Sequence, residues 1–325
     1  MKHVVVEQFG TPEVLKLAEI PSPTPLSDEV LVKVTYVGIG AIDAILRRGD
    51  LGENNVRPPF VPGLEVSGEV VAVGKEVTNI QKGQRVAGLL FFDLGGYAEV
   101  VRVKAERIVL LPNEVDLKDG ASLINPTTAL LTLQKLAPQA KESLIVHAPA
   151  GGLGGAVVSV AKQFYPQTKI IGVIRDADKK SYVTDLGADQ VLMVEEFNKS
   201  IADGERYDMI FDPVGGDIRR TSIDSLKPFG RIVVAGNVTS DAPSNISSRT
   251  VWFNQLSVYG FNLGLFNSVR PELVHKAAQE IVASLKEGKL SLPSSKIFAF
   301  NEVQKAHKYL ESGKLRGRIL LQTQS

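Results

Sequence analysis

A glycine-rich segment, Ala150-Gly151-Gly152-Leu153-Gly154, is the strongest chemical signal in the chain. The short apolar run before it, 143–147, predicts a buried strand, and 156–163 carries apolar residues at helical spacing. A strand that enters a glycine turn and then a helix presents main-chain N–H groups at a helix N-terminus, which suits the pyrophosphate of a dinucleotide. The spacing differs from the ordinary G-x-G-x-x-G, so taken alone the segment could be a loop that only packs a helix on a strand.

Basic residues follow the next apolar run, 169–174, and indicate which dinucleotide would bind. A dinucleotide fold that prefers NAD usually carries Asp or Glu at the end of its second strand. Here Arg175 occupies that place and Lys179 follows closely, so both could hold a 2′-phosphate. Asp176 and Asp178 argue in the other direction, although either could instead cap a helix. We expect NADPH to be preferred over NADH; the alternative is that Arg175 and the lysines form a solvated run of surface charge.

The middle of the chain, about 122–266, alternates strand-like and helix-like segments. Apolar runs that predict further strands lie at 169–174, 191–194, 209–211, 232–235 and 256–259. Helical segments lie between most of them, and this alternation is typical of a parallel sheet. In that context we interpret the glycine-rich segment as a dinucleotide-binding turn.

The first 120 residues or so have a different pattern, in which short β-rich runs are separated by turn signals. They predict a barrel-like or sandwich-like β domain, with runs at 2–6, 29–37, 68–73, 85–90, 97–103 and 108–110. Towards the C-terminus we expect an amphipathic helix, then two strands and a helix that return to the first domain, at 271–286, 295–298, 318–321 and 303–310. The expected organisation is a β domain of 1–121 and 267–325 with an inserted dinucleotide-binding domain of 122–266. A cleft between two such domains is a natural place for a substrate.

The composition excludes several classes of protein. Of the 325 residues, 44% are hydrophobic and 22% charged, and the formal net charge is +1, so no basic field indicates nucleic acid. No apolar run is long enough to predict a membrane span. The chain begins with a strand-like Lys2–Val6 rather than a signal peptide. We therefore expect a cytoplasmic protein that binds neither nucleic acid nor a membrane.

The sequence contains no cysteine, which bears on metal chemistry. Zinc sites that use thiolate ligands are excluded, whether structural or catalytic. The four histidines, His3, His147, His275 and His307, are isolated, and each is expected to be a structural or surface residue rather than a ligand. We expect no metal.

The order and spacing of several short blocks carry a family resemblance over nearly the whole chain. The chain resembles the zinc-free medium-chain dehydrogenase/reductase superfamily, in particular its quinone oxidoreductase (zeta-crystallin-like) branch. The blocks are 62–70 (PGLEVSGEV), 95–99 (GGYAE), 146–154 (VHAPAGGLG), 186–189 (LGAD), 211–216 (FDPVGG) and 317–321 (GRILL). Zinc-dependent relatives have Gly-His-Glu where this chain has Gly63-Leu64-Glu65, and we expect Glu65 to be a paired carboxylate inside the β domain.

This resemblance implies a Rossmann-type doubly wound parallel sheet inserted in a GroES-like β-barrel domain, and a homodimer. It also implies NADPH-dependent reduction of quinones or α,β-unsaturated carbonyl compounds, by hydride transfer without zinc. Ala150 to Gly154 would line the pyrophosphate, with Arg175 and Lys179 near the adenosine phosphate. The remaining cofactor contacts carried over from the family are Gly236, Asn237, Phe261, Asn262 and Arg318, the last in place of a common lysine.

The substrate side departs from the family pattern. Gly40 stands where relatives usually have asparagine, and Ile45 stands where a tyrosine is frequent, so we expect a more apolar pocket for a small carbonyl or quinone substrate. Thr128 and Asn262 are candidate hydrogen-bond donors to a developing enolate or hydroquinone anion. The expected pocket residues, for most of which core packing is the alternative role, are Asp43, Ile45, Leu46, Phe91, Phe92 and Phe266.

Two other functions stay open at this point. The segment Ile124–Ala129 also resembles the 2-enoyl thioester reductase branch, which reduces a conjugated double bond in an acyl thioester. A non-catalytic NADPH-binding sensor is the third possibility. The sequence names neither the physiological electron acceptor nor the proton donor.

Overall fold

The computed structural model describes residues 1–50, 56–237, 245–293 and 295–323. Contacts divide the chain into two compact units, and each is described separately. Unit 1 contains Met1–Ile124, Ala278–Gly288 and Ser294–Ser325, and unit 2 contains Asn125–Ala277 and Lys289–Pro293. Unit 2 is therefore inserted in the sequence of unit 1.

Unit 1 is built around a seven-stranded sheet that joins both ends of the chain. Its order is β14-β15-β3-β4-β5-β7, with β6 also paired to β3, and β1 and β2 form a separate two-stranded sheet. The strands are β1 (Lys2–Val6), β2 (Leu15–Glu19), β3 (Glu29–Ile39), β4 (Glu65–Val73), β5 (Arg85–Leu89), β6 (Val100–Lys104), β7 (Ile108–Leu110), β14 (Ser295–Ala299) and β15 (Arg318–Gln322). β15 runs antiparallel to β3, so the C-terminal segment completes the N-terminal sheet, as expected from the sequence.

Short helices complete unit 1, which has a large apolar core and a smaller cluster around Leu46, Leu64 and Leu94. The core takes residues from β1, β3, β4 and β15 and from the last helix. The helices are η1 (Pro12–Val14), α1 (Ala41–Arg48), η2 (Phe91–Asp93), η3 (Ala105–Arg107), α2 (Leu117–Gly120), η5 (Phe300–Glu302) and α11 (Val303–Glu311). In α11 the apolar residues Val303 and Ala306 are buried, and helical spacing places them on one face.

Unit 2 contains a six-stranded sheet in which every pair is parallel. Its order is β10-β9-β8-β11-β12-β13, so the strand order reverses between β8 and β11. Ligands of such sheets bind at the carboxyl ends of the strands, at the point of reversal. The strands are β8 (Ser143–His147), β9 (Lys169–Ile174), β10 (Gln190–Met193), β11 (Tyr207–Asp212), β12 (Leu226–Val234) and β13 (Ser257–Gly260).

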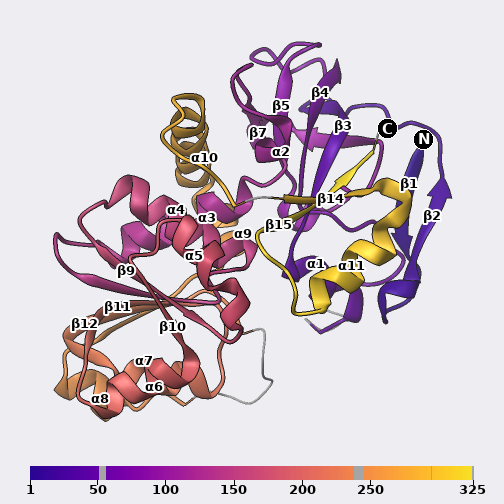
Figure 1. Cartoon of the computed structure of the whole chain (residues 1–325). Coiled ribbons are helices and arrows are strands. Elements are labelled where there is room, and N and C mark those ends of the chain that lie inside the picture. The colour runs from indigo at the N-terminus through magenta and orange to yellow at the C-terminus, as the bar shows by residue number, and fades with distance from the viewer. Residues whose placement is uncertain (51–55, 238–244, 294, 324–325) are drawn as a thin grey trace. The chain divides into compact units, whose positions relative to one another are not determined.

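Helices cover both faces of the unit 2 sheet. Figure 1 shows α3, α4 and α5 on one side of it and α6, α7 and α8 on the other. The bounds are α3 (Ile124–Leu136), α4 (Gly152–Phe164), η4 (Ala177–Lys179), α5 (Lys180–Asp185), α6 (Val194–Ala202), α7 (Asp217–Asp224), α8 (Ser248–Phe253) and α9 (Leu263–Val269). The sequence prediction of a doubly wound parallel sheet is confirmed.

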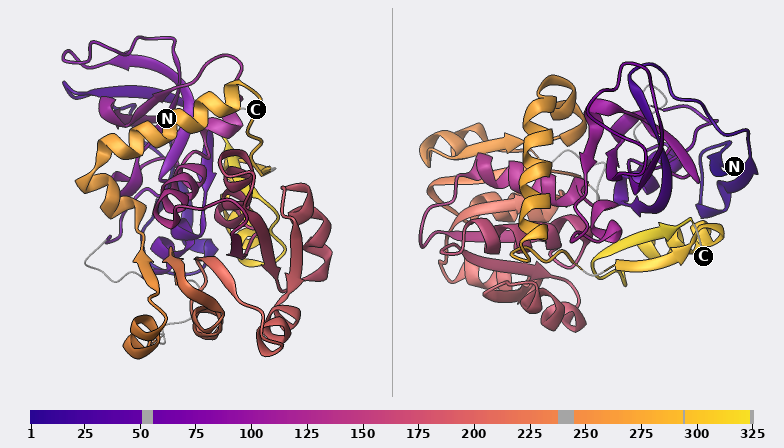
Figure 2. Two further views of the ribbon diagram at one scale, coloured as in Figure 1. Left: turned by 90° about the vertical axis from the view of Figure 1, so that its left-hand side faces the viewer. Right: turned by 90° about the horizontal axis from the view of Figure 1, so that it is seen from above.

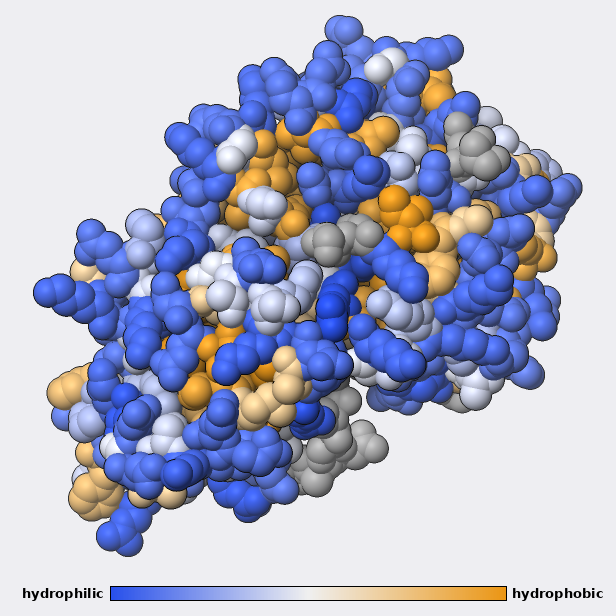
Figure 3. Space-filling model, viewed as in Figure 1, coloured by the Kyte–Doolittle hydropathy of each residue, from blue (hydrophilic) through white to orange (hydrophobic). Residues whose placement is uncertain are grey.

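One long helix, α10 (Pro271–Lys286), was predicted with its bounds and is uninterrupted (Figure 2). On the face of the molecule in Figure 3, hydrophilic residues predominate and hydrophobic ones form smaller patches. Among the helices of the described ranges, none has the length and apolar character to cross a membrane.

Several local predictions differ from the structure, and three of these differences have a clear physical reason. β2 was not predicted, because of its five residues only Leu15 is buried and the alternation is weak. β6 begins at Val100 rather than at 97, although Tyr97 and Glu99 still exchange main-chain hydrogen bonds with β1. α4 begins at Gly152, four residues before the predicted start, because glycines occupy its first turn and hide it from helix propensity.

Candidate functional site

The glycine-rich segment forms a tight turn between β8 and α4. Ala148 has a positive φ of 51°, and the Gly151 amide donates a hydrogen bond to the Ala148 carbonyl at 3.2 Å. A Cβ on Gly154 would lie 2.3 Å from the Ala148 carbonyl oxygen, so the turn and the helix approach too closely for a side chain there. The geometry is the strand–turn–helix arrangement expected from the sequence.

The start of α4 offers main-chain donors beside this turn. Gly151 caps the helix, and the first-turn amides of Gly152, Leu153 and Gly154 have no partner within an α-helix. Gly151, Gly152 and Leu153 are partly exposed, so a ligand can approach their backbone. Together with the positive end of the helix dipole, these amides fit a diphosphate.

Arg175 lies at the end of β9, directly after Ile174, and is exposed. Asp176 is used as an N-cap, because its Oδ1 accepts a hydrogen bond from the Asp178 amide at 3.0 Å. The capping role considered for this aspartate is therefore observed. Lys179 is partly buried at the end of the same short helix.

His147, the last residue of β8, connects the carboxyl end of this central strand to α7. Its Nε2 lies 2.6 Å from the Ser222 hydroxyl. The pKa of His147 is lowered to about 4, chiefly by burial; Asp212 opposes the shift and Arg175 contributes to it. The imidazole is therefore neutral at pH 7, and Arg175 and Asp212 act on it electrostatically.

Two turns follow β11 and β12, at the carboxyl ends of these strands. The side chain of Asp212 is fully buried, and its Oδ1 accepts hydrogen bonds from the Val214 and Gly215 amides at 2.7 and 3.0 Å. Its Oδ2 accepts one from Arg219 Nε at 2.5 Å. Arg219 Nη2 in turn donates to the Gly236 carbonyl at 2.6 Å. Arg219 was not predicted from the sequence, because only its burial in a polar helix distinguishes it from a surface arginine.

The remaining cofactor candidates of unit 2 have local roles as well. The Phe261 amide donates to the Val234 carbonyl at 2.9 Å, which places it beside the end of β12. The Asn262 side chain caps α9 by accepting from the Leu265 amide at 3.0 Å. Thr128 is buried on α3, and its carbonyl accepts from the Thr132 hydroxyl at 2.8 Å. The roles predicted for Thr128 and Asn262 in catalysis stay predictions.

Comparisons with known proteins agree with this architecture. The model of an alcohol dehydrogenase GroES-like domain matches residues 26–113, and that of a zinc-binding dehydrogenase matches residues 186–321. The quinone oxidoreductase of Sus scrofa is 29% identical over 334 residues, which cover 99% of this chain and 97% of that protein. The crystal structure of Escherichia coli quinone oxidoreductase complexed with NADPH matches with a TM-score of 0.88 and 27% identity, over 99% of this chain and all of that one.

The chain belongs to the medium-chain dehydrogenase/reductase superfamily. It lies in the quinone oxidoreductase branch and is an oxidoreductase. A GroES-like domain and a Rossmann-type domain are thereby confirmed as its fold. A further similar structure is the CurK enoyl reductase, with a TM-score of 0.86 and 25% identity over 99% of this chain and 98% of that one.

The donor set of this medium-chain dehydrogenase/reductase does not fit a zinc ion held by thiolates, although one matching model is named for zinc. The sequence has no cysteine, and Leu64 precedes Glu65 where zinc-dependent relatives are expected to have histidine. Within the described ranges, no group of three His, Cys, Asp or Glu residues could hold a metal ion.

Two carboxyl groups are buried in unit 1 of this oxidoreductase. Glu65 Oε2 accepts a hydrogen bond from the Ile124 amide at 2.8 Å, and burial raises the pKa of Glu65 to about 8. Burial likewise raises the pKa of Asp43 to about 7, although the Gly40 amide, which donates to its Oδ2 at 2.8 Å, opposes the shift. Both carboxyls therefore titrate near neutral pH rather than near pH 4.

Helix α1, which carries Asp43, also carries Arg47. Arg47 belongs to a buried hydrogen-bond network that extends to His307 and Glu311 on α11. Arg47 Nη1 lies 3.2 Å from His307 Nδ1, and His307 Nε2 lies 2.9 Å from the Tyr97 hydroxyl. Because Arg47 can only donate, Nδ1 accepts and the ring proton is on Nε2, donated to Tyr97. Arg47 also pairs with Glu311 at 2.7 Å. Burial, with a further contribution from Arg47, lowers the pKa of His307 to about 3. His307 is thus a structural residue, as expected.

The predicted pocket residues of unit 1 differ in exposure. Leu46 is 2% exposed and packs against Leu64 and Leu94. Phe91 is buried as well, whereas its neighbour Phe92 is 45% exposed. In unit 2, Phe266 contacts Phe261, with ring centroids 5.4 Å apart. Which of these side chains face a substrate stays a prediction.

Arg318, predicted as a cofactor contact, is 6% exposed at the start of β15. Its Nη2 pairs with Asp119 Oδ1 at 2.9 Å, and its charge lowers the pKa of Glu65 in opposition to burial. The guanidinium therefore has a structural role within unit 1. Its role toward the cofactor stays a prediction.

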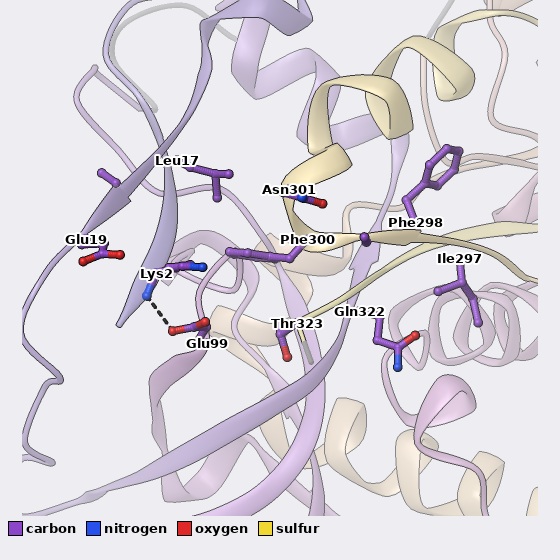
Figure 4. Close-up of a pocket in the computed structure, with 12 residues that line it drawn as sticks. Lys2, Leu17, Glu19, Glu99, Ile297, Phe298, Phe300, Asn301, Gln322 and Thr323 are labelled. Atoms are coloured by element: carbon purple, nitrogen blue, oxygen red, sulfur yellow. Dashed lines mark hydrogen bonds between the residues drawn. The ribbon is translucent and has the colours of Figure 1, made fainter. Parts of the chain in front are cut away.

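A separate cavity of about 650 Å³ lies in unit 1, between side chains of β1, β2, β14 and β15. Figure 4 shows Lys2, Leu17 and Phe300 around it, with the Lys2 amide donating to Glu99 at 2.7 Å. None of the residues predicted for the functional site lines this cavity. It therefore does not belong to the site predicted from the sequence.

Proposed function

We propose that this protein is an NADPH-dependent reductase of quinones or α,β-unsaturated carbonyl compounds, and that it works without zinc. The observation that carries the proposal is the turn between β8 and α4, where main-chain donors at a helix start meet a bend too tight for a side chain at Gly154. Quinone oxidoreductases that match over nearly the whole chain, one of them solved with NADPH, support it. The absence of cysteine supports zinc independence.

In this proposal the chain's residues divide the dinucleotide between them. The amides after Gly151 hold the diphosphate, and Arg175 with Lys179 attracts the 2′-phosphate by charge-assisted hydrogen bonds. The turns at 213–216 and 236–237 form the part of the site that receives the nicotinamide half of the dinucleotide. When bound, NADPH supplies the hydride, and the protein contributes orientation and exclusion of water.

The apolar character expected of the substrate side suits a small quinone or enone. Leu46 and Phe91 are apolar and buried, and Ile45 is partly buried on α1. Burial raises the pKa values of two carboxyls, Asp43 and Glu65, to about 7 and about 8. A homodimer is part of the same proposal, and sedimentation of the full chain tests it.

A second candidate is a 2-enoyl thioester reductase. The likeness to the CurK enoyl reductase favours it, as does the segment Ile124–Ala129. Both candidates reduce a conjugated bond with the same cofactor, so only the acceptor separates them.

The test is a screen of NADPH oxidation by the full chain with quinones, enals and enoyl thioesters. Acceleration by quinones or enals supports the first candidate, and acceleration by thioesters alone replaces it with the second. Gly152→Val is the matched variant, because its side chain blocks approach to the helix start, and it should abolish NADPH binding and turnover. Binding of NADPH without turnover of any acceptor would leave a non-catalytic sensor.

A further inference from the structure

The turns after β11 and β12 touch so closely that neither can change alone. A Cβ on Gly215, whose φ is +83°, would lie 2.0 Å from Asn237 Oδ1. A Cβ on Gly236 would lie 2.6 Å from the Pro213 carbonyl oxygen. Both distances are shorter than a real Cβ contact, so the position of each turn fixes that of the other.

A buried ion pair joins the two turns. Asp212 binds the amides of the first turn, and Arg219 Nε donates to Asp212 while Nη2 donates to the Gly236 carbonyl of the second. Arg219 Nη1 also points to Asn237 Oδ1 at 3.5 Å. We call Asp212 and Arg219 the turn bridge.

The turn bridge is expected to add little to the free energy of unfolding. Moving two charges out of water costs several kcal/mol per ion, and apolar replacements of buried pairs are often as stable. Asp212 is 0% and Arg219 7% exposed, so both are removed from water. We therefore assign the ion pair a geometric role, because a planar guanidinium fixes the directions of its hydrogen-bond partners.

The strand order indicates which part of a dinucleotide the turns would meet. Arg175 follows β9, on one side of β8, whereas both turns follow β11 and β12, on the other side. If the diphosphate lies at the β8 turn and the 2′-phosphate at Arg175, the nicotinamide end lies over the two turns.

We propose that Asp212 and Arg219 are positioning residues that hold the turn at Gly236–Asn237 in the shape required by the nicotinamide half of the coenzyme. The inference rests on the proposed function. It adds that the nicotinamide half and the adenosine half depend on different residues of unit 2.

The test compares two ligands on the full chain, NADPH and 2′,5′-ADP, which lacks the nicotinamide half. Arg219→Lys keeps the charge but cannot reach both the carboxylate and the carbonyl. It should weaken NADPH binding about 10-fold and change 2′,5′-ADP binding less than about 2-fold, measured by titration calorimetry. The matched control is Arg220→Lys, because Arg220 is the exposed neighbour that pairs with Asp217, and it should leave both affinities unchanged.

A second variant keeps the test independent of the ion pair's effect on folding. Gly215→Ala removes neither charge of the turn bridge, but its methyl group would lie 2.0 Å from Asn237 Oδ1 and 3.3 Å from Arg219 Nη2. It therefore displaces the second turn without breaking the ion pair by deletion, and it should reproduce the selective loss of NADPH affinity. Equal losses for the two ligands, or an unchanged NADPH affinity in both variants, would overturn the inference. If the unmodified protein binds neither ligand, the proposed function itself fails, which is a distinguishable result.

Discussion

Two buried charged clusters of this protein use similar groups in different ways. The turn bridge of unit 2 joins residues seven positions apart, and its partners are mainly backbone groups of two turns. The cluster of unit 1, which we call the Arg47–His307 network and which includes Tyr97 and Glu311, joins side chains separated by 210 to 264 positions. The turn bridge therefore fixes the conformation of two neighbouring turns, whereas the Arg47–His307 network connects segments that are distant in sequence.

This difference separates binding from stability. A local bridge between turns changes the backbone to which a ligand binds. A long-range network adds its effect mainly to the free energy of unfolding, because its partners meet only in the folded chain. Variants of the two clusters should therefore separate a loss of stability from a loss of binding.

Loss of Arg47 should give the largest change in stability. The side chain of Arg47 is 1% exposed. Arg47→Met leaves His307 Nδ1 and the Gly10 carbonyl without this donor, and Glu311 keeps only its bond from Arg48. Loss of this buried charged side chain, with its hydrogen bonds to Gly10, His307 and Glu311, should cost about 3–5 kcal/mol, which urea denaturation would measure. NADPH affinity of the folded variant should stay unchanged.

The matched control for that variant is Arg48→Met. Arg48 binds the same Glu311 carboxylate at 2.7 Å, but its side chain is 39% exposed, so its loss should cost less than about 1 kcal/mol. Equal losses for Arg47 and Arg48 would contradict the assignment of stability to the buried network.

Glu65 should make stability depend on pH. Its pKa is raised from 4.5 to about 8 by burial, so the folded protein holds this proton more tightly than the unfolded chain between those values. The contribution of Glu65 is therefore fully present below about pH 4.5 and falls as the pH rises through 8. Relative to Glu65→Gln, the stability of the unmodified protein should fall by about 4 kcal/mol between these pH values.

The measurement for Glu65 is a series of urea denaturations of both proteins across that pH range. The difference between the two proteins cancels the opposing titrations of His147 and His307, whose pKa values are lowered by burial. A difference that does not vary with pH would show that Glu65 titrates like a surface carboxyl.

Arg175→Ala should affect binding and leave stability almost unchanged. A charged group that holds a phosphate contributes about 1.5–3 kcal/mol, so NADPH affinity should fall roughly 10- to 100-fold while NADH affinity changes little. Lys169→Ala, at the exposed first residue of β9, serves as the control. Parallel losses for NADPH and NADH would refute the assignment of Arg175 to the 2′-phosphate.

The smallest effect is expected from the exposed pair Arg220–Asp217, with side chains 68% and 93% exposed. Arg220→Met should change the free energy of unfolding by less than about 0.5 kcal/mol. A larger loss of stability in thermal denaturation would show that burial does not determine how much an ion pair of α7 contributes. The comparison between the two buried clusters would then be contradicted.

Much of the fold was predictable because its signals are local. Apolar runs predicted the strands of unit 2, and helical spacing predicted α10 with its bounds. The glycine-rich segment predicted the turn before α4. β2 escaped prediction, since four of its residues are not buried and its pairing partner is its main support.

The candidate site was predictable only where one segment carries the chemistry. The partners of Arg219 lie on the ends of β11 and β12, and His307 finds Arg47 across 260 positions. No spacing rule connects such residues, because their proximity is a product of the folded chain. Likewise, the raised pKa values of Asp43 and Glu65 follow from burial, which the residue types do not reveal.

The strand order of unit 2 has a practical consequence for protein engineering. β8 separates the segment that carries Arg175 from the two interlocked turns after β11 and β12. Under the proposed function, coenzyme preference could therefore be redesigned at Arg175 without disturbing the two turns. Redesign of the reactive end, in contrast, would need simultaneous changes in both turns, since neither backbone leaves room for the other to move.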